Sequence, residues 1–292
     1  MGVCPNCGSW VDEGDVCGCC GGSGSYESDE TQNVNDMNFR RDECARKAWD
    51  FYNDFRDEDA LDYIERALDI DGEDSENWNK KAIILEAMKR YEESERCYST
   101  SLDLCWSDVV SDNMAKMLYY WALQLFEDSK KQDYGLDMLD GAKRIAKRAM
   151  AARPGGRSSQ NIDMYLSLWD RINYSIGHER KYQTDLDELR GYYKSKLFTI
   201  TGIRFNYNGP LYRNMPLELR REPDNAYDPD AIAVYSNGGR IGYVANSKRT
   251  THELTLSASE LQSELKDGDK VEYVLHLERY ADVQFHIGRI VR

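Results

Sequence analysis

The sequence predicts a multi-domain α+β chain, and three observations divide it into parts. Five of its eight cysteines crowd between positions 4 and 20. From about residue 40 to 195 the apolar spacing is helical, and from residue 196 it changes to short alternating strands. We therefore expect a cysteine-rich ribbon over 1–22, a flexible acidic linker over 23–38, an all-α helical-repeat stack over 39–195 and a small β-barrel over 196–292.

Length limits the number of domains, and charge argues against one class of nucleic-acid-binding protein. The 292 residues leave room for two domains of ordinary size, with 52 acidic against 38 basic side chains and a net charge of −14. Residues 196–292 carry 13 of each sign, so the acidic excess lies in residues 1–195. A protein that tracks along duplex nucleic acid needs a basic face, which this chain lacks.

Hydropathy gives an expectation about location. No apolar run approaches the roughly 18 residues of a membrane-spanning helix. The first residues, MGVCPNCG, lack the basic flank and apolar stretch of a secretory signal. We therefore expect a cytoplasmic protein without a membrane partner.

The first part contains two C-x-x-C pairs, Cys4–Cys7 and Cys17–Cys20, each followed by glycine. Two such turns place four thiolates about 2.3 Å from a tetrahedral zinc ion. Without an export signal this crowding favours metal over disulfides, and the alternatives are a redox dithiol or a tail that binds no metal. The segment resembles short zinc ribbons, and four protein ligands imply a structural zinc. Cys19 competes with Cys17 and Cys20, and the C-x-x-C spacing selects the latter two.

The helical part contains an internal repeat with a period of 34 residues. Residues 77–104 form its clearest unit, with Trp78 near the start, and the pattern resembles tetratricopeptide (TPR) repeats. A degenerate third unit carries Trp121 on one helix and Ile145 on the next. Helices over 162–175 and 184–195 are expected to cap the stack. The matching pairs are Ala48 with Ala82, Ala60 with Ser94, Ile64 with Tyr98, Ala67 with Ser101, and Leu68 with Leu102.

Repeat stacks of this kind usually bind peptide segments on their concave face, so we expect a protein partner there. A spacer or a dimerisation surface is the alternative. Basic side chains could clamp a peptide carboxylate, although cations on a solvated helix face look the same in sequence. The candidates are Lys80, Lys81, Lys89 and Arg90.

The last part reads as short strands interrupted by one helix, at whose start Ser257 and Glu260 are spaced as a capping box. Several short strands with one helix favour a small barrel. Two of the strands enclose the turn-rich segment 223–230, where prolines, Asx residues and one aromatic predict a rigid polar loop.

The amino-acid sequence around this loop is similar to that of a known family. Residues 217–234 read LELRREPDNAYDPDAIAV and residues 238–247 read GGRIGYVANS. This resembles the HIRAN domain, whose pattern is REPxNxYDxxAIxV followed by GY, over about the last third of the chain. The resemblance implies a barrel related to OB or SH3 folds. It also implies recognition of the 3′ end of single-stranded DNA.

In the family, a basic–aromatic pair after the first strand and a Tyr-Asp pair in the turn form the pocket. Arg204-Phe205 and Tyr227-Asp228 stand at these places, with Phe where the family example has Tyr. Aromatic rings can stack on terminal bases, Arg204 could hold a phosphate, and Asp228 could accept a hydrogen bond from a 3′-hydroxyl. The predicted DNA-binding set is Arg204, Phe205, Asn225, Tyr227, Asp228 and Tyr243.

Each of these residues also has a structural interpretation. Asp224, Asn225 and Asp228 could cap the turn through their own backbone. Tyr227 could be a core residue at a barrel corner, and Arg204 could pair with Asp228.

Together these features predict a non-enzymatic adaptor, because no constellation of nucleophile and base is visible. Its barrel would bind a single-stranded DNA 3′ end or an aberrant DNA in DNA repair, and its repeats would recruit a protein. One alternative is a protein-interaction scaffold whose barrel binds peptide. Another is a regulator of an enzyme that supplies catalysis. The barrel, 196–292, is expected to fold alone.

Overall fold

The computed structural model describes residues 2–3, 10–11, 29–132, 135–152, 162–193, 196–279 and 283–291. It divides into two compact units, one of residues 1–127 with 141–169 and the other of residues 128–140 with 170–292. Strand β1 (Gly2–Val3) pairs antiparallel with β2 (Trp10–Val11). The predicted zinc ligands Cys4, Cys7, Cys17 and Cys20, and their competitor Cys19, lie outside the described residues, so the ribbon stays a prediction.

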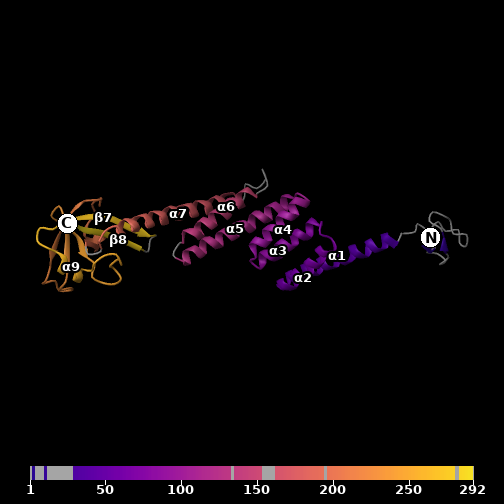
Figure 1. The fold of residues 1–292 in the computed structure, drawn as a ribbon, viewed down its shortest axis with the longest axis horizontal. Helices are drawn as coiled ribbons and strands as arrows, with labels where there is room; N and C mark the ends of the chain where they lie inside the picture. The colour runs from indigo at the N-terminus through magenta and orange to yellow at the C-terminus, as the bar shows by residue number, and fades with distance from the viewer. Residues whose placement is uncertain are drawn as a thin grey trace. The chain divides into compact units, whose positions relative to one another are not determined.

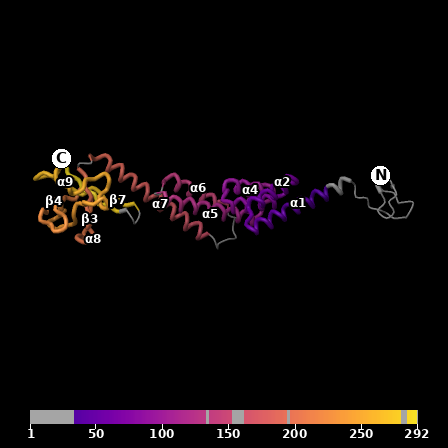
Figure 2. The backbone as a smooth tube through the Cα atoms, turned by 90° about the horizontal axis from the view of Figure 1, so that it is seen from below, coloured from indigo at the N-terminus to yellow at the C-terminus, as the bar shows by residue number. Residues whose placement is uncertain are grey.

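The first unit is a stack of helices, which confirms the predicted all-α repeat (Figures 1 and 2). Helix α1 packs on α2 and α3 packs on α4 as hairpins. In the described residues no helix combines the length and apolarity needed to cross a membrane. The helices are α1 (Asp29–Asn53), α2 (Asp57–Ile70), α3 (Ser75–Ala87), α4 (Tyr91–Leu104), α5 (Asp108–Lys131), α6 (Leu136–Ala151) and α7 (Ile162–Arg190).

The 34-residue period reflects burial at equivalent positions of the first two hairpins. Small side chains lie where two helices cross, and the Ser94 hydroxyl there donates to the Ala82 carbonyl oxygen over 2.8 Å. Phe55 and Lys89 occupy equivalent turns and share a left-handed backbone, with φ of 60° and 59°. Of the fifth pair, Leu68 is buried and Leu102 is only half-buried. The positions buried in both repeats are Ala48 with Ala82, Ala60 with Ser94, Ile64 with Tyr98, and Ala67 with Ser101.

Two expected boundaries in the helical part are wrong. Helix α1 begins at Asp29, so residues 29–38 are helical rather than a linker. Helix α7 runs without a break where two separate capping helices were expected. Side chains four residues apart support the continuous helix: the Tyr174 and His178 rings, 4.1 Å apart, span Gly177, and Lys181 pairs with Asp185 over 2.7 Å one turn further along. At about 0.2–0.5 kcal/mol each, these contacts offset part of the roughly 1 kcal/mol that a helical glycine costs.

The second unit confirms the predicted small β-barrel. Among the described residues, the strands close in the order β3-β6-β5-β4-β7-β8, and every neighbouring pair is antiparallel. The predicted capping box is present at the start of helix α9 (Ala258–Glu264), with Ser257 and Glu260 bonding each other's backbone. The strands are β3 (Leu197–Thr201), β4 (Pro216–Arg221), β5 (Ile232–Ser236), β6 (Gly239–Val244), β7 (Lys270–Arg279) and β8 (Val283–Val291).

The barrel has an apolar interior, and two of its strands approach each other closely at the glycine of the GY motif. Buried side chains that include Phe198, Ile232 and Ile241 fill the interior. A Cβ atom on Gly242 would lie 2.4 Å from the Thr201 carbonyl oxygen, so only glycine lets β6 approach β3 this closely. The short helix α8 (Ile203–Asn206) then leaves β3 and packs beside β6.

The end of α7 belongs to the barrel unit. Leu186 and Leu189 pack on a second apolar cluster with Leu197, Leu275 and Ile287, on barrel strands. Beside this cluster a buried ion pair joins α7 to β7. Glu179, only 2% exposed, accepts from both Nε and Nη2 of Arg279 over 3.0 Å. A bidentate pair of this kind fixes orientation as well as contact.

Candidate functional site

The turn between β4 and β5 is organised by Asn225. Its Oδ1 accepts the backbone N–H of Tyr227 over 3.0 Å and that of Asp228 over 3.3 Å. Its Nδ2 donates to Glu222 Oε2 over 3.0 Å. An Asx side chain that caps its own turn in this way sets the loop conformation. The structure therefore gives Asn225 a structural role, and its predicted contact with DNA stays a prediction.

Asp228 fastens the turn to the end of β6. Its Oδ1 accepts the Asp230 backbone N–H over 2.9 Å, and its Oδ2 accepts Asn246 Nδ2 over 2.8 Å. Asn246 Oδ1 in turn accepts the backbone N–H of Ser259 in α9 over 3.0 Å. The half-buried Asp228 carboxylate keeps further lone pairs for a ligand hydroxyl.

Two further motif residues hold the base of the turn. Arg221 donates to the carbonyl oxygens of Gln262 and Leu265, over 3.0 and 2.6 Å, which ties β4 to α9. The Tyr243 hydroxyl donates to Glu222 Oε2 over 3.2 Å and accepts from Arg240 over 2.6 Å. Burial, with the neighbouring Glu222 carboxylate, raises the pKa of Tyr243. The Tyr243 hydroxyl thus already donates one hydrogen bond and accepts another, both with residues of the same barrel.

Tyr227 differs from its neighbours in the turn. Its side chain is 98% exposed and has no hydrogen-bond or ring partner within the described residues. The interpretation of Tyr227 as a barrel-corner core residue is therefore wrong. The turn ties the side chains of Asn225 and Asp228 into its own hydrogen bonds and presents one aromatic ring to solvent.

The second predicted pair, Arg204-Phe205, lies on helix α8. Phe205 is 77% exposed, and the Arg204 guanidinium lies 4.5 Å from the centre of its ring. This contact is a cation–π pair, which leaves the other face of the ring open. In the described structure the Arg204 guanidinium forms no ion pair. It and the Phe205 ring are therefore both available to contact a ligand.

Strand β6 separates the two pairs. Tyr243 is opposite Thr201 of β3 on one side and Ala233 of β5 on the other. Arg204-Phe205 follows β3, and Tyr227-Asp228 precedes β5. Both therefore flank β6, but no hydrogen bond, ion pair or ring contact between described residues joins them. In particular, the alternative pairing of Arg204 with Asp228 is not formed.

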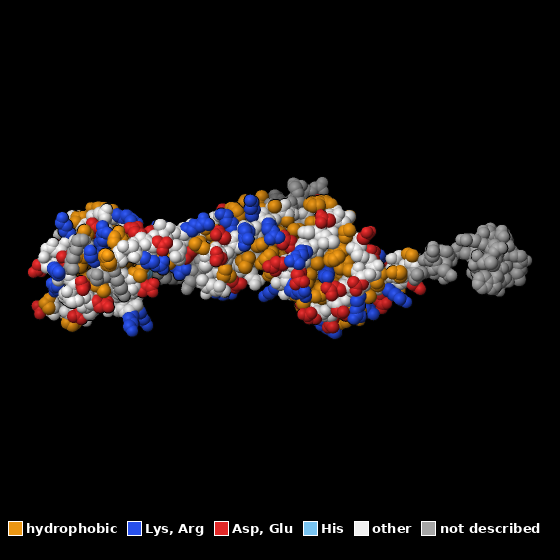
Figure 3. All heavy atoms as spheres, in the orientation of Figure 1, with side chains coloured by type: hydrophobic (Ala, Val, Ile, Leu, Met, Phe, Trp, Pro, Cys, Tyr) orange, Lys and Arg blue, Asp and Glu red, His pale blue; other side chains and the backbone are white. Residues whose placement is uncertain are grey.

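Charge on the barrel is mixed. On the face drawn in Figure 3, Lys and Arg side chains stand among Asp and Glu side chains. The balanced count over residues 196–292 agrees with this picture. Such a surface suits a ligand held at a small site better than one held along a continuous basic track.

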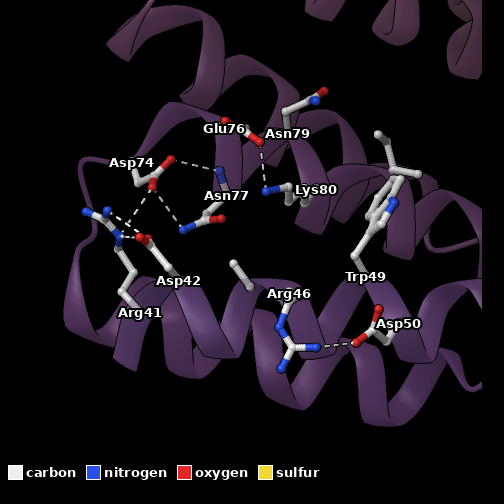
Figure 4. Close-up of a pocket in the computed structure, with 12 residues that line it drawn as sticks. Arg41, Asp42, Arg46, Trp49, Asp50, Asp74, Glu76, Asn77, Asn79 and Lys80 are labelled. Carbon is white, nitrogen blue, oxygen red and sulfur yellow. Dashed lines mark hydrogen bonds and ion pairs between the residues drawn. The ribbon is translucent and has the colours of Figure 1, made fainter. Parts of the chain in front are cut away.

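The repeats carry a separate recess between α1 and α3, with a volume of 840 Å³ (Figure 4). Its charged side chains are largely paired with one another. Arg46 Nη1 bonds Asp50 Oδ2 over 2.9 Å, and Lys80 Nζ bonds Glu76 Oε1 over 2.8 Å. Trp49 lines the recess, and the Asn79 side-chain oxygen beside it is buried without a hydrogen-bond partner in the described structure.

The four candidate clamp cations do not converge. Lys80 pairs with Glu76, Lys81 pairs with Glu65 over 2.8 Å, and Arg90 forms a bidentate pair with Glu93 over 2.7 and 2.6 Å. Lys89 is exposed in the turn between α3 and α4. Because three of the four are already neutralised, a cluster that captures a peptide carboxylate is not formed by them.

Comparison with known proteins identifies the barrel. The family model of the HIRAN domain matches residues 194–254. These residues are a HIRAN domain. The match confirms the resemblance read from the REPxNxYDxxAIxV pattern, and it spans strands β3 to β6, the turn and helix α8.

A solved structure is similar to the helical part. It is the second TPR domain of the human RPAP3 protein in complex with the HSP70 peptide SGPTIEEVD. Identity is 14% and the TM-score is 0.31, with 47% of this chain and 98% of that chain covered. No curated protein matches the sequence.

Sequence reasoning missed the residues that hold the HIRAN turn in place. Glu222 accepts from both Asn225 and Tyr243, and Asn246 bridges Asp228 to Ser259. Glu222 is part of the identifying pattern, so its position in the motif is the signal that could have found it. Asn246 has no such signal, because its partner lies 18 residues away in sequence.

Proposed function

We propose that the HIRAN domain binds the 3′ end of single-stranded DNA through Tyr227. The observation that carries this proposal is the 98% exposure of Tyr227 in a turn whose neighbouring side chains are bonded internally. A large aromatic ring held in the open by a rigid loop is ready to stack on a base, at about 1–3 kcal/mol per base. Phe205, 77% exposed beyond the other edge of β6, offers a second ring.

Charged groups near these rings support recognition of an end. Arg204, free of ion pairs in the described structure, can contact a backbone phosphate. The Asp228 carboxylate can accept a hydrogen bond from a 3′-hydroxyl, whereas a 3′-phosphate would meet its negative charge. The mixed charge of the barrel fits a site with few phosphate contacts.

The repeats supply the second half of the proposal, the capture of a protein partner. Helical hairpins with a recess between α1 and α3 suit an extended segment of another chain. The protein would then act as a cytoplasmic, non-enzymatic adaptor between DNA ends and that partner, in a role such as DNA repair.

A structural zinc ion completes the proposal. The pairing of Gly2–Val3 with Trp10–Val11 brings together the residues on either side of the first C-x-x-C pair. Cys4, Cys7, Cys17 and Cys20 would hold the ion, and its coordination would supply most of the folding free energy of so short a segment.

The test is fluorescence anisotropy of the full chain with single strands ending in a 3′-hydroxyl or a 3′-phosphate. The hydroxyl strand should bind more tightly, and Asp228→Asn should reduce this preference because it removes the repelling charge. Asp224→Asn is the matched control, since Asp224 lies exposed in the same turn and loses the same charge. Equal binding of both strands by the unaltered protein would contradict recognition of the end.

The second candidate function is a barrel that binds peptide. The exposed rings of Tyr227 and Phe205 could serve it equally well, and the neutral charge of the barrel favours it over long DNA. Absence of binding to any single strand, with the fold intact, would favour this candidate.

A further inference from the structure

A second recess of the repeats, with a volume of 420 Å³, is walled by aromatic rings. Tyr52 of α1, Tyr91 of α4 and Tyr120 of α5 line it. Tyr120 is 53% exposed, and the other two are half-buried. Rings contributed by three different helices form a site that only the folded stack can assemble.

Neighbouring rings hold two of these walls in place. Tyr52 stacks on Trp49 with ring centres 5.0 Å apart, and Tyr91 stacks on Trp121 with centres 5.7 Å apart. The Tyr91 hydroxyl also donates to Gln124 Oε1 over 2.9 Å. The walls are therefore preorganised, which lowers the entropy cost of binding a ligand.

A carboxylate also lines this recess. Glu86 of α3 accepts the hydroxyl of the fully buried Tyr98 over 3.1 Å. Among the described residues no Lys, Arg or His forms an ion pair with Glu86. Burial raises the pKa of Glu86, which the Tyr98 hydrogen bond only partly offsets. A partly desolvated carboxylate without a counter-ion gains from a cation that binds beside it.

The other charges of the recess do not neutralise Glu86. Lys116 of α5 pairs with Asp112 over 2.6 Å. Lys89 lines the recess from the exposed turn between α3 and α4. Its backbone N–H donates to the Glu86 carbonyl oxygen over 2.9 Å, but in the described structure its ammonium group forms no ion pair with the Glu86 carboxylate. Aromatic faces beside a carboxylate are the combination that binds ammonium and guanidinium groups.

We propose that this recess holds a cationic side chain, a lysine or an arginine, of the protein segment that the repeats bind. The proposal rests on the proposed capture of a partner and names its chemistry. The sequence led us to expect basic residues of the repeats to bind a carboxylate of the partner. The proposal is the opposite: an acidic residue of the repeats, Glu86, binds a cation of the partner.

The experiment records methyl NMR spectra of the full chain during titration with Nα-acetyl-lysine methylamide or Nα-acetyl-arginine methylamide. Nα-acetyl-norleucine methylamide, which has a similar chain and no charge, is the control probe. The Ala87 methyl group lines this recess and reports binding, and the Ile290 methyl group in the barrel core should not move. Whichever cationic probe shifts Ala87 at the lower concentration identifies the preferred side chain.

Three variants test the parts of the site. Glu86→Gln keeps an acceptor for the Tyr98 hydroxyl and removes the charge, so affinity for the cationic probe should fall about 10-fold. Tyr120→Leu should weaken it about three- to tenfold, whereas Tyr120→Phe, which keeps the ring, should not. Glu76→Gln, on the same helix but in the other recess, is the matched control.

Equal shifts from the norleucine and lysine probes would overturn the proposal. Unchanged binding by a folded Glu86→Gln variant would do the same. Because these probes report on the repeats alone, their failure leaves the DNA-end test of the HIRAN domain unaffected.

Discussion

At the scale of single residues, Tyr227 is the informative position of the HIRAN turn. Asn225 and Asp228 bond their own loop, while the Tyr227 ring lies 98% exposed. Aromatic side chains usually bury their large apolar surface, and this open ring on a constrained loop is the observation behind the proposed stacking on a base. The motif residues thus divide into those that shape the loop and one that the loop presents.

Tyr227→Ala should weaken binding to single-stranded DNA by about 1–3 kcal/mol, because one stacking ring is lost. Its melting temperature should stay within a degree or so of the unaltered protein, since an exposed ring without partners adds little stability. Anisotropy and thermal melting on the same samples measure both effects.

Tyr212→Ala is the control for this variant, because Tyr212 is 55% exposed on the same barrel outside the turn. It should leave DNA affinity unchanged. A folded Tyr227→Ala protein that binds as tightly as the Tyr212→Ala protein would remove Tyr227 from the proposed interface.

At the scale of elements, helix α7 joins the helical part to the barrel. Its first residues, up to Trp169, belong to the first unit, and the residues from Asp170 onward belong to the second. Leu186 and Leu189 cover apolar residues of β3, β7 and β8. The predicted boundary at residue 196 therefore separates the barrel from a helix that covers part of its surface.

A fragment of residues 170–292 should be more stable than one of residues 196–292. Burial of each leucine of α7 contributes about 1.5–3 kcal/mol, and the shorter fragment also leaves Arg279 without Glu179. Urea unfolding of both fragments measures the difference. Equal urea midpoints of the two fragments would show that α7 does not stabilise the barrel.

Within the full chain, Leu189→Ala should lower the unfolding free energy of the barrel unit by about 2–5 kcal/mol, because Leu189 is fully buried. Leu166→Ala on the same helix is the matched control, since Leu166 is 43% exposed. A loss as large for Leu166→Ala would show that helix propensity, rather than packing on the barrel, accounts for the effect.

The same barrel unit should lose stability in acid because of a histidine pair on β7 and β8. The rings of His276 and His286 stack with centres 4.3 Å apart, and the Tyr273 hydroxyl lies 2.9 Å from His286 Nδ1. Burial, and then the neighbouring His276, lowers the pKa of His286 to about 4. Lys181 and Asp185 of α7 and Glu278 of β7 are the charged groups near His276.

In the unfolded chain His286 binds its proton near pH 6.5, so the unfolded state takes up more protons between pH 6.5 and 4. The stability of the barrel is therefore complete above pH 6.5 and should fall as pH drops through this window. Melting temperatures of the unaltered protein and of His286→Asn measure it, and the variant should show a flatter slope. Identical slopes would assign the acid sensitivity to other groups.

At the scale of the whole molecule, charge is divided unevenly along the chain. The barrel region 196–292 is neutral, and residues 1–195 carry the entire net charge of −14. Long DNA should therefore be repelled by the N-terminal two thirds, with an effect that salt screens. This division favours recognition of an end or a short strand by the HIRAN domain.

The predicted zinc site should be independent of the helices. Purified protein should contain one zinc ion per chain, and Cys4→Ser with Cys20→Ser should remove it. Cys105→Ser is the control, since Cys105 is an exposed free thiol at the end of α4. Chelation should leave the helical circular dichroism signal nearly unchanged. Full zinc content in the double variant would exclude this ligand set.

Local patterns in the sequence predict which helices and strands form in the described parts. A 34-residue period predicted the positions where Ala48, Ala82 and Tyr98 are buried, because helix crossings demand the same side-chain sizes in each repeat. Alternating apolar residues predicted the barrel strands, and the spacing of Ser257 and Glu260 predicted a helix start. These features depend on residues close to one another in the sequence, so they can be predicted from the spacing of residue types.

The folded structure was needed to show which groups far apart in the sequence come into contact. It placed Asn246 against Asp228, bonded Glu179 of α7 to Arg279, and left Tyr227 in solvent. It also paired three of the four candidate clamp cations with acidic neighbours, and among the described residues it gave Glu86 no counter-ion. The free energy of such contacts depends on burial and on partners far apart in the chain, and neither can be read from local spacing.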